Sequence, residues 1–269
     1  MLDDSQLQQY RDDGYLIIDI GLSEDVTDGV VSDLSPYWGK NRIQPKGVSY
    51  ADGNRIQDAW KISENVKNLC INPLILKALK QLYKKKPLPF QTLNFEMGTE
   101  QRTHADSIHF NTEPFGFMCG VWIALEDIGP EQGPVKYYPG TNKLPEINYE
   151  DAGVVAHSSH YPEYENHIEN IVKEHDFQPM HALLQKGQAL IWSANLLHGG
   201  SRQLDKTLTR RSQVTHYYFD ETQYWRPSLS QNGRHYFVPG WIPYTENRDW
   251  FGGFNRKKQQ LINRILNKL

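Results

Sequence analysis

The sequence predicts a mainly β fold with flanking helices, an α+β arrangement around one large core. The chain has 269 residues, enough for a single domain of this kind. Its 15 Tyr, 20 Gly and 15 Pro favour short strands separated by turns. Helix-like segments come first and strand-like segments follow, without the regular alternation of a doubly wound sheet. This order favours a double-stranded β-helix, the two-sheet jelly-roll core of cupin-like proteins.

The N-terminal part, residues 1–87, is expected to be mainly helical. Gly14 can end the first helix, and Asn72 can cap a helix that starts with Pro73 and ends among lysines. The other expected elements of this part are helices within residues 3–15 and 23–39 and a short strand at 15–20.

The jelly-roll core is expected at residues 88–220, as part of one domain that spans residues 1–269. Its strand-like segments are "LPFQTLNFEMG", "GFMCGVWIALEDI", "PVKYYPG", "GQALIWSANLLHGG" and "RRSQVTHYYF". Residues 146–185 are polar and interrupt the strands, so we expect an insertion over the barrel mouth. Residues 221–269 form a C-terminal extension that ends in an amphipathic helix at 255–269.

Composition limits the classes of partner. The formal net charge of −3 gives no global field that favours nucleic acid or an anionic membrane. Two cysteines do not form a disulfide framework, and neither a signal peptide nor an apolar run of membrane-spanning length is visible. We therefore expect a cytoplasmic monomer or weak homodimer that acts on a small molecule, without nucleic acid or membrane.

A candidate metal site lies in "THADSIHF". His104 and Asp106 stand two residues apart, so on extended backbone both side chains point to one side. His198 ends a strand-like segment 94 residues later and can supply a third ligand. The rival pair His167 and Glu169 lies in a helix-like segment, where positions i and i+2 diverge.

Two imidazoles and one carboxylate commonly hold the ferrous iron that activates oxygen, with one side of the ion left open. A bidentate 2-oxo acid can occupy that side, and its distal carboxylate would prefer a planar, permanently charged guanidinium. Arg210 and Arg211 open the strand after His198 and are the candidates for this role.

The sequence resembles the phytanoyl-CoA dioxygenase family of Fe(II)/2-oxoglutarate-dependent oxygenases over residues 5–220. The resemblance rests on "LQQYRDDGYLII", "GVWIALEDIGPEQGPVKYYPGTNK", "KGQALIWSANLLHGGS" and "RRSQVTHYYF", in that order. It implies a dioxygenase that uses Fe(II), 2-oxoglutarate and O2, with His104, Asp106 and His198 as catalytic metal ligands.

The resemblance also implies residues that bind 2-oxoglutarate. Arg211 is preferred over Arg210, because the polar residue and hydrophobic strand that follow it match the family pattern. Strand alternation places Arg211 on the opposite face from Arg210. The other residues carried over are Lys61, Asn94 and Trp122. His109 lies outside the triad and is expected to face the substrate or support the metal ligands.

The implied reaction is hydroxylation of an unactivated C–H bond of a small polar molecule, with release of succinate and CO2. Related oxygenases that halogenate carry Gly or Ala in place of the carboxylate, so Asp106 favours hydroxylation. Two alternatives remain at this point: a cupin-like metal-dependent isomerase or epimerase, and a non-catalytic ligand-binding member of the fold.

Overall fold

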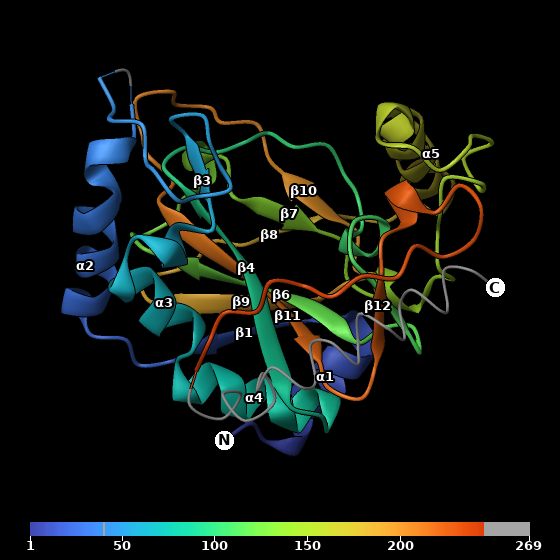
Figure 1. Ribbon diagram of the computed structural model, residues 1–269, viewed down its shortest axis with the longest axis horizontal. Coiled ribbons are helices and arrows are strands. Elements are labelled where there is room, and N and C mark those ends of the chain that lie inside the picture. The colour runs from blue at the N-terminus through green and yellow to red at the C-terminus, as the bar shows by residue number, and fades with distance from the viewer. Residues whose placement is uncertain (40, 245–269) are drawn as a thin grey trace.

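The computed structural model describes residues 1–39 and 41–244 (Figure 1). The amphipathic helix expected at 255–269 lies outside these residues. The α-helices are α1 (Asp4–Asp13), α2 (Glu24–Leu34), α3 (Glu64–Cys70), α4 (Pro73–Tyr83) and α5 (Tyr161–Glu174).

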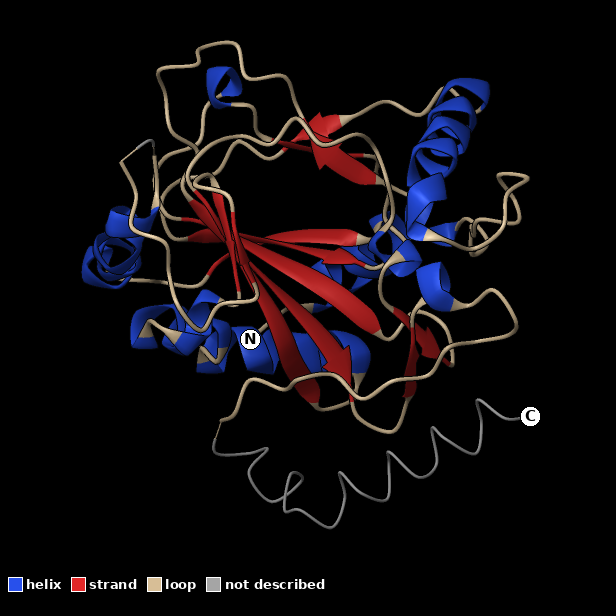
Figure 2. Cartoon of the chain, turned by 45° about the horizontal axis from the view of Figure 1, so that its top comes forward, coloured by secondary structure: helices blue, strands red, loops and turns tan. Residues whose placement is uncertain are grey.

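The strands form a mainly antiparallel fold, as predicted. They are β1 (Tyr15–Asp19), β2 (Tyr50–Ala51), β3 (Arg55–Gln57), β4 (Pro87–Phe95), β5 (Asn111–Glu113), β6 (Met118–Ala124), β7 (Val135–Tyr137), β8 (Met180–His181), β9 (Gln188–Ser193), β10 (His198–Gly200), β11 (Ser212–Phe219) and β12 (Gln223–Trp225). The large sheet has the order β1-β9-β6-β11-β4-β3-β2, and a smaller sheet has the order β10-β7-β8. Figure 2 shows the large sheet in the middle of the molecule, with helices along one side.

Capping side chains and a glycine define the ends of two of the helices. Asp3 accepts from the backbone N–H of Gln6 in a capping box, and Gly14 ends α1 with φ 77°, a backbone angle that glycine adopts without strain. Asn72 accepts from two N–H groups at the start of α4, which begins with Pro73. Such a cap contributes about 1 kcal/mol of stability, so these signals fix the ends of α1 and α4.

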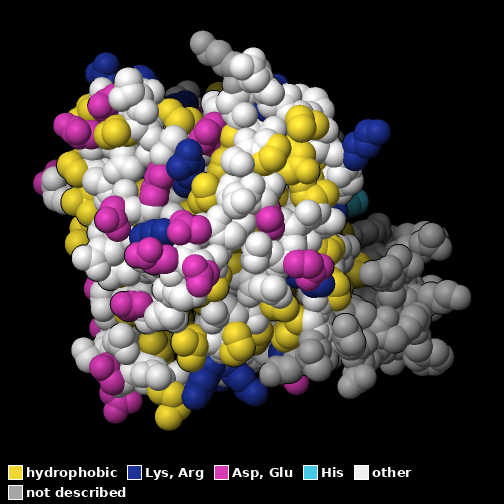
Figure 3. All heavy atoms as spheres, turned by 90° about the vertical axis from the view of Figure 1, so that its left-hand side faces the viewer, with side chains coloured by type: hydrophobic (Ala, Val, Ile, Leu, Met, Phe, Trp, Pro, Cys, Tyr) yellow, Lys and Arg dark blue, Asp and Glu magenta, His cyan; other side chains and the backbone are white. Residues whose placement is uncertain are grey.

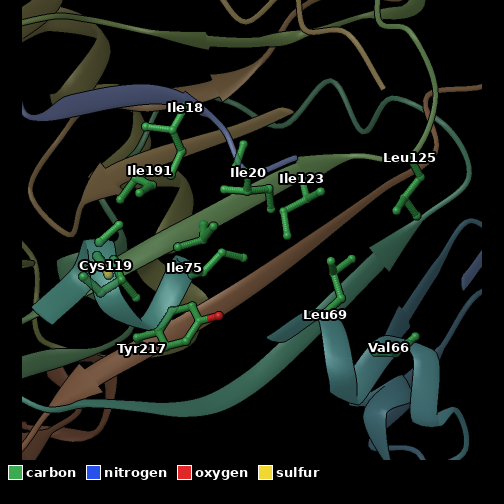
Figure 4. Close-up of a cluster of buried hydrophobic side chains, with 14 of the residues drawn as sticks. Ile18, Ile20, Val66, Leu69, Ile75, Cys119, Ile123, Leu125, Ile191 and Tyr217 are labelled. Atoms are coloured by element: carbon green, nitrogen blue, oxygen red, sulfur yellow. The ribbon is translucent and has the colours of Figure 1, made fainter. Parts of the chain in front are cut away.

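The large sheet has two different faces, because successive side chains of a strand point to opposite sides. On β6, Cys119, Val121 and Ile123 join a hydrophobic cluster with the helices, which we call the helix face. Figure 4 shows part of this cluster, with Leu69 and Ile75 from the helices beside Ile123. Trp122 and Ala124 point to the other side, where the smaller sheet lies, which we call the cavity face.

The surface on the α2 side of the molecule carries Asp and Glu interspersed with Lys and Arg (Figure 3). This view shows no continuous basic patch. Within residues 1–39 and 41–244, no helix has both the length and the hydrophobicity that crossing a bilayer requires.

Candidate metal centre

The candidate ligands His104 and His198 are joined by the backbone. Each donates its N–H to the other's carbonyl oxygen at 2.9 Å, in an isolated antiparallel bridge. The bridge places the two imidazole rings side by side, with centroids 4.5 Å apart. Two residues that are 94 positions apart in the sequence are therefore neighbours before any ion is considered.

Asp106 completes the group. Ala105 is extended, with φ −111° and ψ 140°, so Asp106 points to the same side as His104, as the sequence predicts. Its Oδ1 lies 3.8 Å from Nε2 of His104 and 3.8 Å from Nε2 of His198. One potential ligand atom from each residue lies within 4.8 Å of the other two. The three residues could therefore hold one metal ion.

Hydrogen bonds set the tautomers of the two histidines. Nδ1 of His104 donates to the carbonyl oxygen of Arg102 at 2.9 Å, and Nδ1 of His198 donates to that of Leu196 at 3.0 Å. A carbonyl oxygen can only accept, so Nδ1 carries the proton in each ring. Each Nε2 is therefore unprotonated and has a lone pair to offer a metal; that of His104 also lies 3.3 Å from the amide nitrogen of Gln101.

The second oxygen of Asp106 is held from the sheet below it. Nε1–H of Trp192 on β9 donates to Oδ2 at 2.8 Å, and Nε2 of His216 on β11 lies 3.7 Å from the same oxygen. The indole reaches this position across Gly120 on β6, where an added Cβ would lie 2.4 Å from the Trp192 ring. The bond to Trp192 leaves Oδ1 to face the histidines.

Burial and charge set the protonation states of the group. Burial lowers the pKa of His104 to about 3; the neighbouring His198 also lowers it, while Asp106 opposes the shift. Burial raises the pKa of Asp106, but its histidine neighbours and the Trp192 hydrogen bond outweigh that effect, so its pKa lies below the usual range. At neutral pH the site thus has an ionised carboxylate and a neutral His104, the forms that bind a metal. Two imidazole nitrogens and one carboxylate oxygen are the donor set that suits non-haem Fe(II).

A cavity of about 250 Å³ opens beside this group, on the cavity face of the large sheet. Its volume lies just below the ~300–1,000 Å³ of typical small-molecule pockets. Besides the three candidate ligands, its polar and aromatic lining residues are Arg55, Gln57, Gln91, Phe95, Thr99, Gln101, His109, Phe110, Trp122, Trp192, Arg210 and His216.

The two adjacent arginines have opposite environments. Arg210 lines the cavity and is 2% exposed; its guanidinium lies 5.5 Å from the Trp122 ring centroid and its Nε has no hydrogen-bond partner. Nη1 donates to the carbonyl oxygen of Gly133 at 3.3 Å. Burial, which no neighbouring acid offsets, lowers the pKa of Arg210 to about 10. A buried guanidinium of this kind is a site for an anion.

Arg211 does not line the cavity, contrary to the expectation. Its Nη1 lies 3.6 Å from Glu126 Oε2, and its side chain is about one-third exposed. Side chains alternate between the two faces along β11 and in the two residues before it, as predicted. The side that carries Arg211 and Gln213, however, is the helix face. Alternation predicts which residues share a face, but it does not predict which of the two faces holds the cavity.

The other expected binding residues divide between the two faces. Trp122 lines the cavity. Lys61 does not: its Nζ lies 3.3 Å from Asp58 Oδ2 on the helix side of the molecule. Asn94 also points to the helix face, where its Nδ2 donates to Gln213 Oε1 at 3.0 Å. Lys61 and Asn94 were expected beside the cosubstrate, but neither residue lines the cavity.

His109, expected near the triad, lines the cavity with its ring centroid 6.0 Å from that of His104. Sequence reasoning missed Trp192, His216 and Arg55. The signal for His216 was its even spacing from Arg210, since residues 210, 212, 214 and 216 share one side of the strand. Arg55 and Trp192 had no distinguishing local motif.

Comparisons with known proteins agree with this fold. A sequence profile of the family Phytanoyl-CoA dioxygenase (PhyH) matches residues 10–211. A relative from Danio rerio, phytanoyl-CoA dioxygenase domain-containing protein 1, is 33% identical over 85 residues, which is 30% of this chain and only about a quarter (26%) of that protein.

Two solved structures are similar over most of the chain. The non-haem α-ketoglutarate-dependent carbocyclase SnoK from nogalamycin biosynthesis has a TM-score of 0.68 and 17% identity, covering 89% of this chain and 92% of SnoK. EctD from S. alaskensis with 2-oxoglutarate and 5-hydroxyectoine has a TM-score of 0.64 and 13% identity, covering 87% and 82%. At these identities, the likeness establishes the jelly-roll fold.

Proposed function

The chain belongs to the phytanoyl-CoA dioxygenase family, and from this premise we propose that it is a non-haem Fe(II)- and 2-oxoglutarate-dependent dioxygenase. It hydroxylates an unactivated C–H bond of a small polar molecule. The observation that carries the proposal is the meeting of His104, Asp106 and His198 beside a cavity that also contains an uncompensated buried arginine. Both SnoK and EctD, of the same fold, are described with this cosubstrate.

Fe(II) held by these three residues, together with 2-oxoglutarate and O2, would supply the oxidation and release succinate and CO2. The contribution of the chain is to place and shield these groups. His104 and His198 present Nε2 because their Nδ1 protons are committed to carbonyl oxygens. Asp106 presents Oδ1 because Trp192 holds its Oδ2.

Arg210 is the proposed partner of the distal carboxylate of 2-oxoglutarate. Its guanidinium is buried, has an unpaired Nε and lies close to Trp122 and Phe95. A planar guanidinium can pair with a carboxylate through two hydrogen bonds, and burial strengthens such a pair. Binding of this carboxylate would supply the negative charge that the burial of Arg210 demands.

The carboxylate at position 106 favours hydroxylation over halogenation, because it occupies the position that a halide would need. Proteins of this fold also catalyse other reactions, since SnoK is a carbocyclase. The position of the substrate relative to the metal therefore decides the product. A metal-dependent isomerase that does not use 2-oxoglutarate would form no succinate, so O2-dependent succinate formation excludes that alternative. An α-ketoglutarate-dependent epimerase, as SnoN of similar fold is described, is separated from a hydroxylase by identifying the product.

The test uses His198→Ala, with His167→Ala on α5 as the matched control. Anaerobic protein is mixed with Fe(II) and 2-oxoglutarate, and the visible charge-transfer band is recorded; succinate is then measured after O2 is admitted. We expect the wild type and His167→Ala to give both signals. We expect His198→Ala to give neither, with unchanged circular dichroism. Full band and turnover in His198→Ala would refute the assignment.

A further inference from the structure

The cavity extends along β11 between two polar residues. Arg210 and His216 both line it, and they are six residues apart on extended backbone, so their backbones are separated by roughly 20 Å. Asp106 lies at the His216 end, since its Oδ2 is 3.7 Å from Nε2 of His216. The next step rests on the proposed function. If 2-oxoglutarate lies between Arg210 and the metal ligands, the end of the cavity at His216 is left for the substrate.

His109 and Phe110 form a wall of this end. Both line the cavity, and the Phe110 ring centroid lies 5.6 Å from that of His216. The His109 ring centroid lies 6.0 Å from that of His104 and 4.9 Å from that of Tyr161 on α5. A group that binds His109 is therefore held next to the metal ligands, which is where a substrate has to be positioned for reaction.

The polar groups of this wall lack partners within the described part of the chain. Neither ring nitrogen of His109 forms a hydrogen bond there; the residue uses only its backbone N–H, which donates to the carbonyl oxygen of Asp106 at 2.9 Å. The Tyr161 hydroxyl, beside Gln101, is buried and has no partner at hydrogen-bond geometry. Buried polar groups are nearly always hydrogen-bonded, because an unsatisfied one costs about 1–3 kcal/mol. His109 can be satisfied from the cavity that it lines.

The wall at His109 suits an uncharged partner. Burial lowers the pKa of His109 to about 4, and Asp106 opposes this shift, so the ring is neutral at neutral pH. A neutral imidazole offers one N–H donor and one acceptor nitrogen. The nearby cation Arg226 packs over the rings of Phe110 and Phe237 and does not line the cavity. A group that can both accept and donate therefore matches His109 better than an ion does.

We propose that the substrate presents an uncharged hydroxyl or carboxamide group to His109, with its carbon skeleton against Phe110. Either group can donate one hydrogen bond and accept another, and a neutral imidazole can use both. The C–H bond that is oxidised lies a few atoms from this group, because His109 is next to His104. A cavity of about 250 Å³ shared with the cosubstrate limits the substrate to a compact alcohol or amide.

The test uses probes of nearly the same shape and different charge: acetamide, acetate and acetamidinium, with 2-propanol as the hydroxyl probe. Each is titrated into anaerobic protein loaded with Fe(II) and saturating 2-oxoglutarate, at one ionic strength so that screening is equal. Binding is followed by the relaxation of the probe's protons, which paramagnetic Fe(II) accelerates when the probe is held close to it.

The variants separate hydrogen bonding from shape. His109→Phe keeps an aromatic ring and removes both nitrogens, whereas His109→Gln keeps one donor and one acceptor group. The matched control is His175→Phe, because His175 is exposed and does not line the cavity.

We expect acetamide or 2-propanol to bind the wild type and His175→Phe, and to bind His109→Phe about 3- to 10-fold more weakly, the change that loss of one neutral hydrogen bond gives. His109→Gln should retain most of the affinity. Acetate and acetamidinium should change less than about twofold in His109→Phe, because neither finds a counter-charge at this wall. Tighter binding of acetamide identifies a carboxamide, and tighter binding of 2-propanol a hydroxyl. Equal losses for acetate and acetamide, no loss in His109→Phe, or no binding of either neutral probe to the wild type would overturn the proposal.

The charge-transfer band of the probe-free protein separates this inference from the proposed function. The band should be present in the wild type and retained in His109→Phe, because His109 contacts the substrate and not the cosubstrate. Loss of the band in His109→Phe alone would assign His109 to the metal or the cosubstrate and overturn the inference. Absence of the band in the wild type would refute the proposed function, on which the inference rests.

Discussion

The two faces of the large sheet differ in whether their positively charged side chains are paired with carboxylates. On the helix side, Lys61 lies 3.3 Å from Asp58 and Arg211 lies 3.6 Å from Glu126. On the cavity face, Arg210 is 2% exposed and has no carboxylate at ion-pair distance among the described residues. An unpaired charge in a buried place destabilises the folded state. Its presence on one face indicates that this face is completed by ligands and the other by the chain itself.

The largest expected difference is in 2-oxoglutarate affinity, between variants of the neighbouring residues Arg210 and Arg211. Arg210→Gln should weaken 2-oxoglutarate binding by about 100-fold, because a buried guanidinium that pairs with a carboxylate contributes a few kcal/mol. Arg211→Gln should change it by less than about twofold. Titration of the anaerobic charge-transfer band measures both. Similar losses in the two variants would remove the distinction between the faces.

A smaller effect is expected for the support of Asp106. Trp192→Phe removes the N–H that holds Oδ2 while keeping a smaller aromatic ring, and should weaken Fe(II) binding about tenfold, as for other residues that orient metal ligands. Gly120→Ala should act in the same direction, because its Cβ would displace the indole. Fe(II) titration with and without a competing chelator gives the affinity.

The control for this pair is Trp38→Phe, which changes a buried tryptophan of the helix-face cluster. It should leave Fe(II) affinity unchanged. If Trp38→Phe and Trp192→Phe weaken iron binding equally, the effect is one of general packing rather than of the bond to Asp106.

The helix face should respond in stability and not in ligand binding. Asn94→Ala leaves Oε1 of Gln213 without its buried donor, and should lower the free energy of unfolding by about 1–3 kcal/mol. Urea denaturation measures the loss, while the affinity for 2-oxoglutarate should stay within about twofold. A selective loss of 2-oxoglutarate binding would return Asn94 to the cosubstrate site.

The smallest effect is expected for Lys61→Met. Its ammonium is partly exposed and paired with Asp58, and such pairs contribute about 0–1 kcal/mol. Thermal denaturation should therefore shift little, and the charge-transfer band should not change. A marked loss of the band would contradict the position that we assign to Lys61.

The sequence predicted the features that local rules determine. The caps at Asn72 and Gly14 follow from side-chain and backbone chemistry, and the convergence of His104 with Asp106 follows from extended backbone at Ala105. Side-chain alternation, which extends to the two residues before β11, separated Arg210 from Arg211 correctly. It could not tell which side faces the cavity, because that depends on where the helices pack. Trp192 and His216 escaped notice for the same reason, since their contacts with Asp106 exist only after three strands are assembled.

The backbone bridge between His104 and His198 has one further consequence. Two main-chain hydrogen bonds join the backbones of the two histidines, and Nδ1 hydrogen bonds to carbonyl oxygens hold the rings, so contacts within the chain already bring the candidate ligands together. A preassembled nitrogen-and-oxygen socket accepts Co²⁺, Ni²⁺ or Cu²⁺ at least as tightly as Fe²⁺ under the general affinity order of these ions. Which metal occupies the site therefore depends on which ions are available. Traces of the competing ions should inhibit the protein without unfolding it.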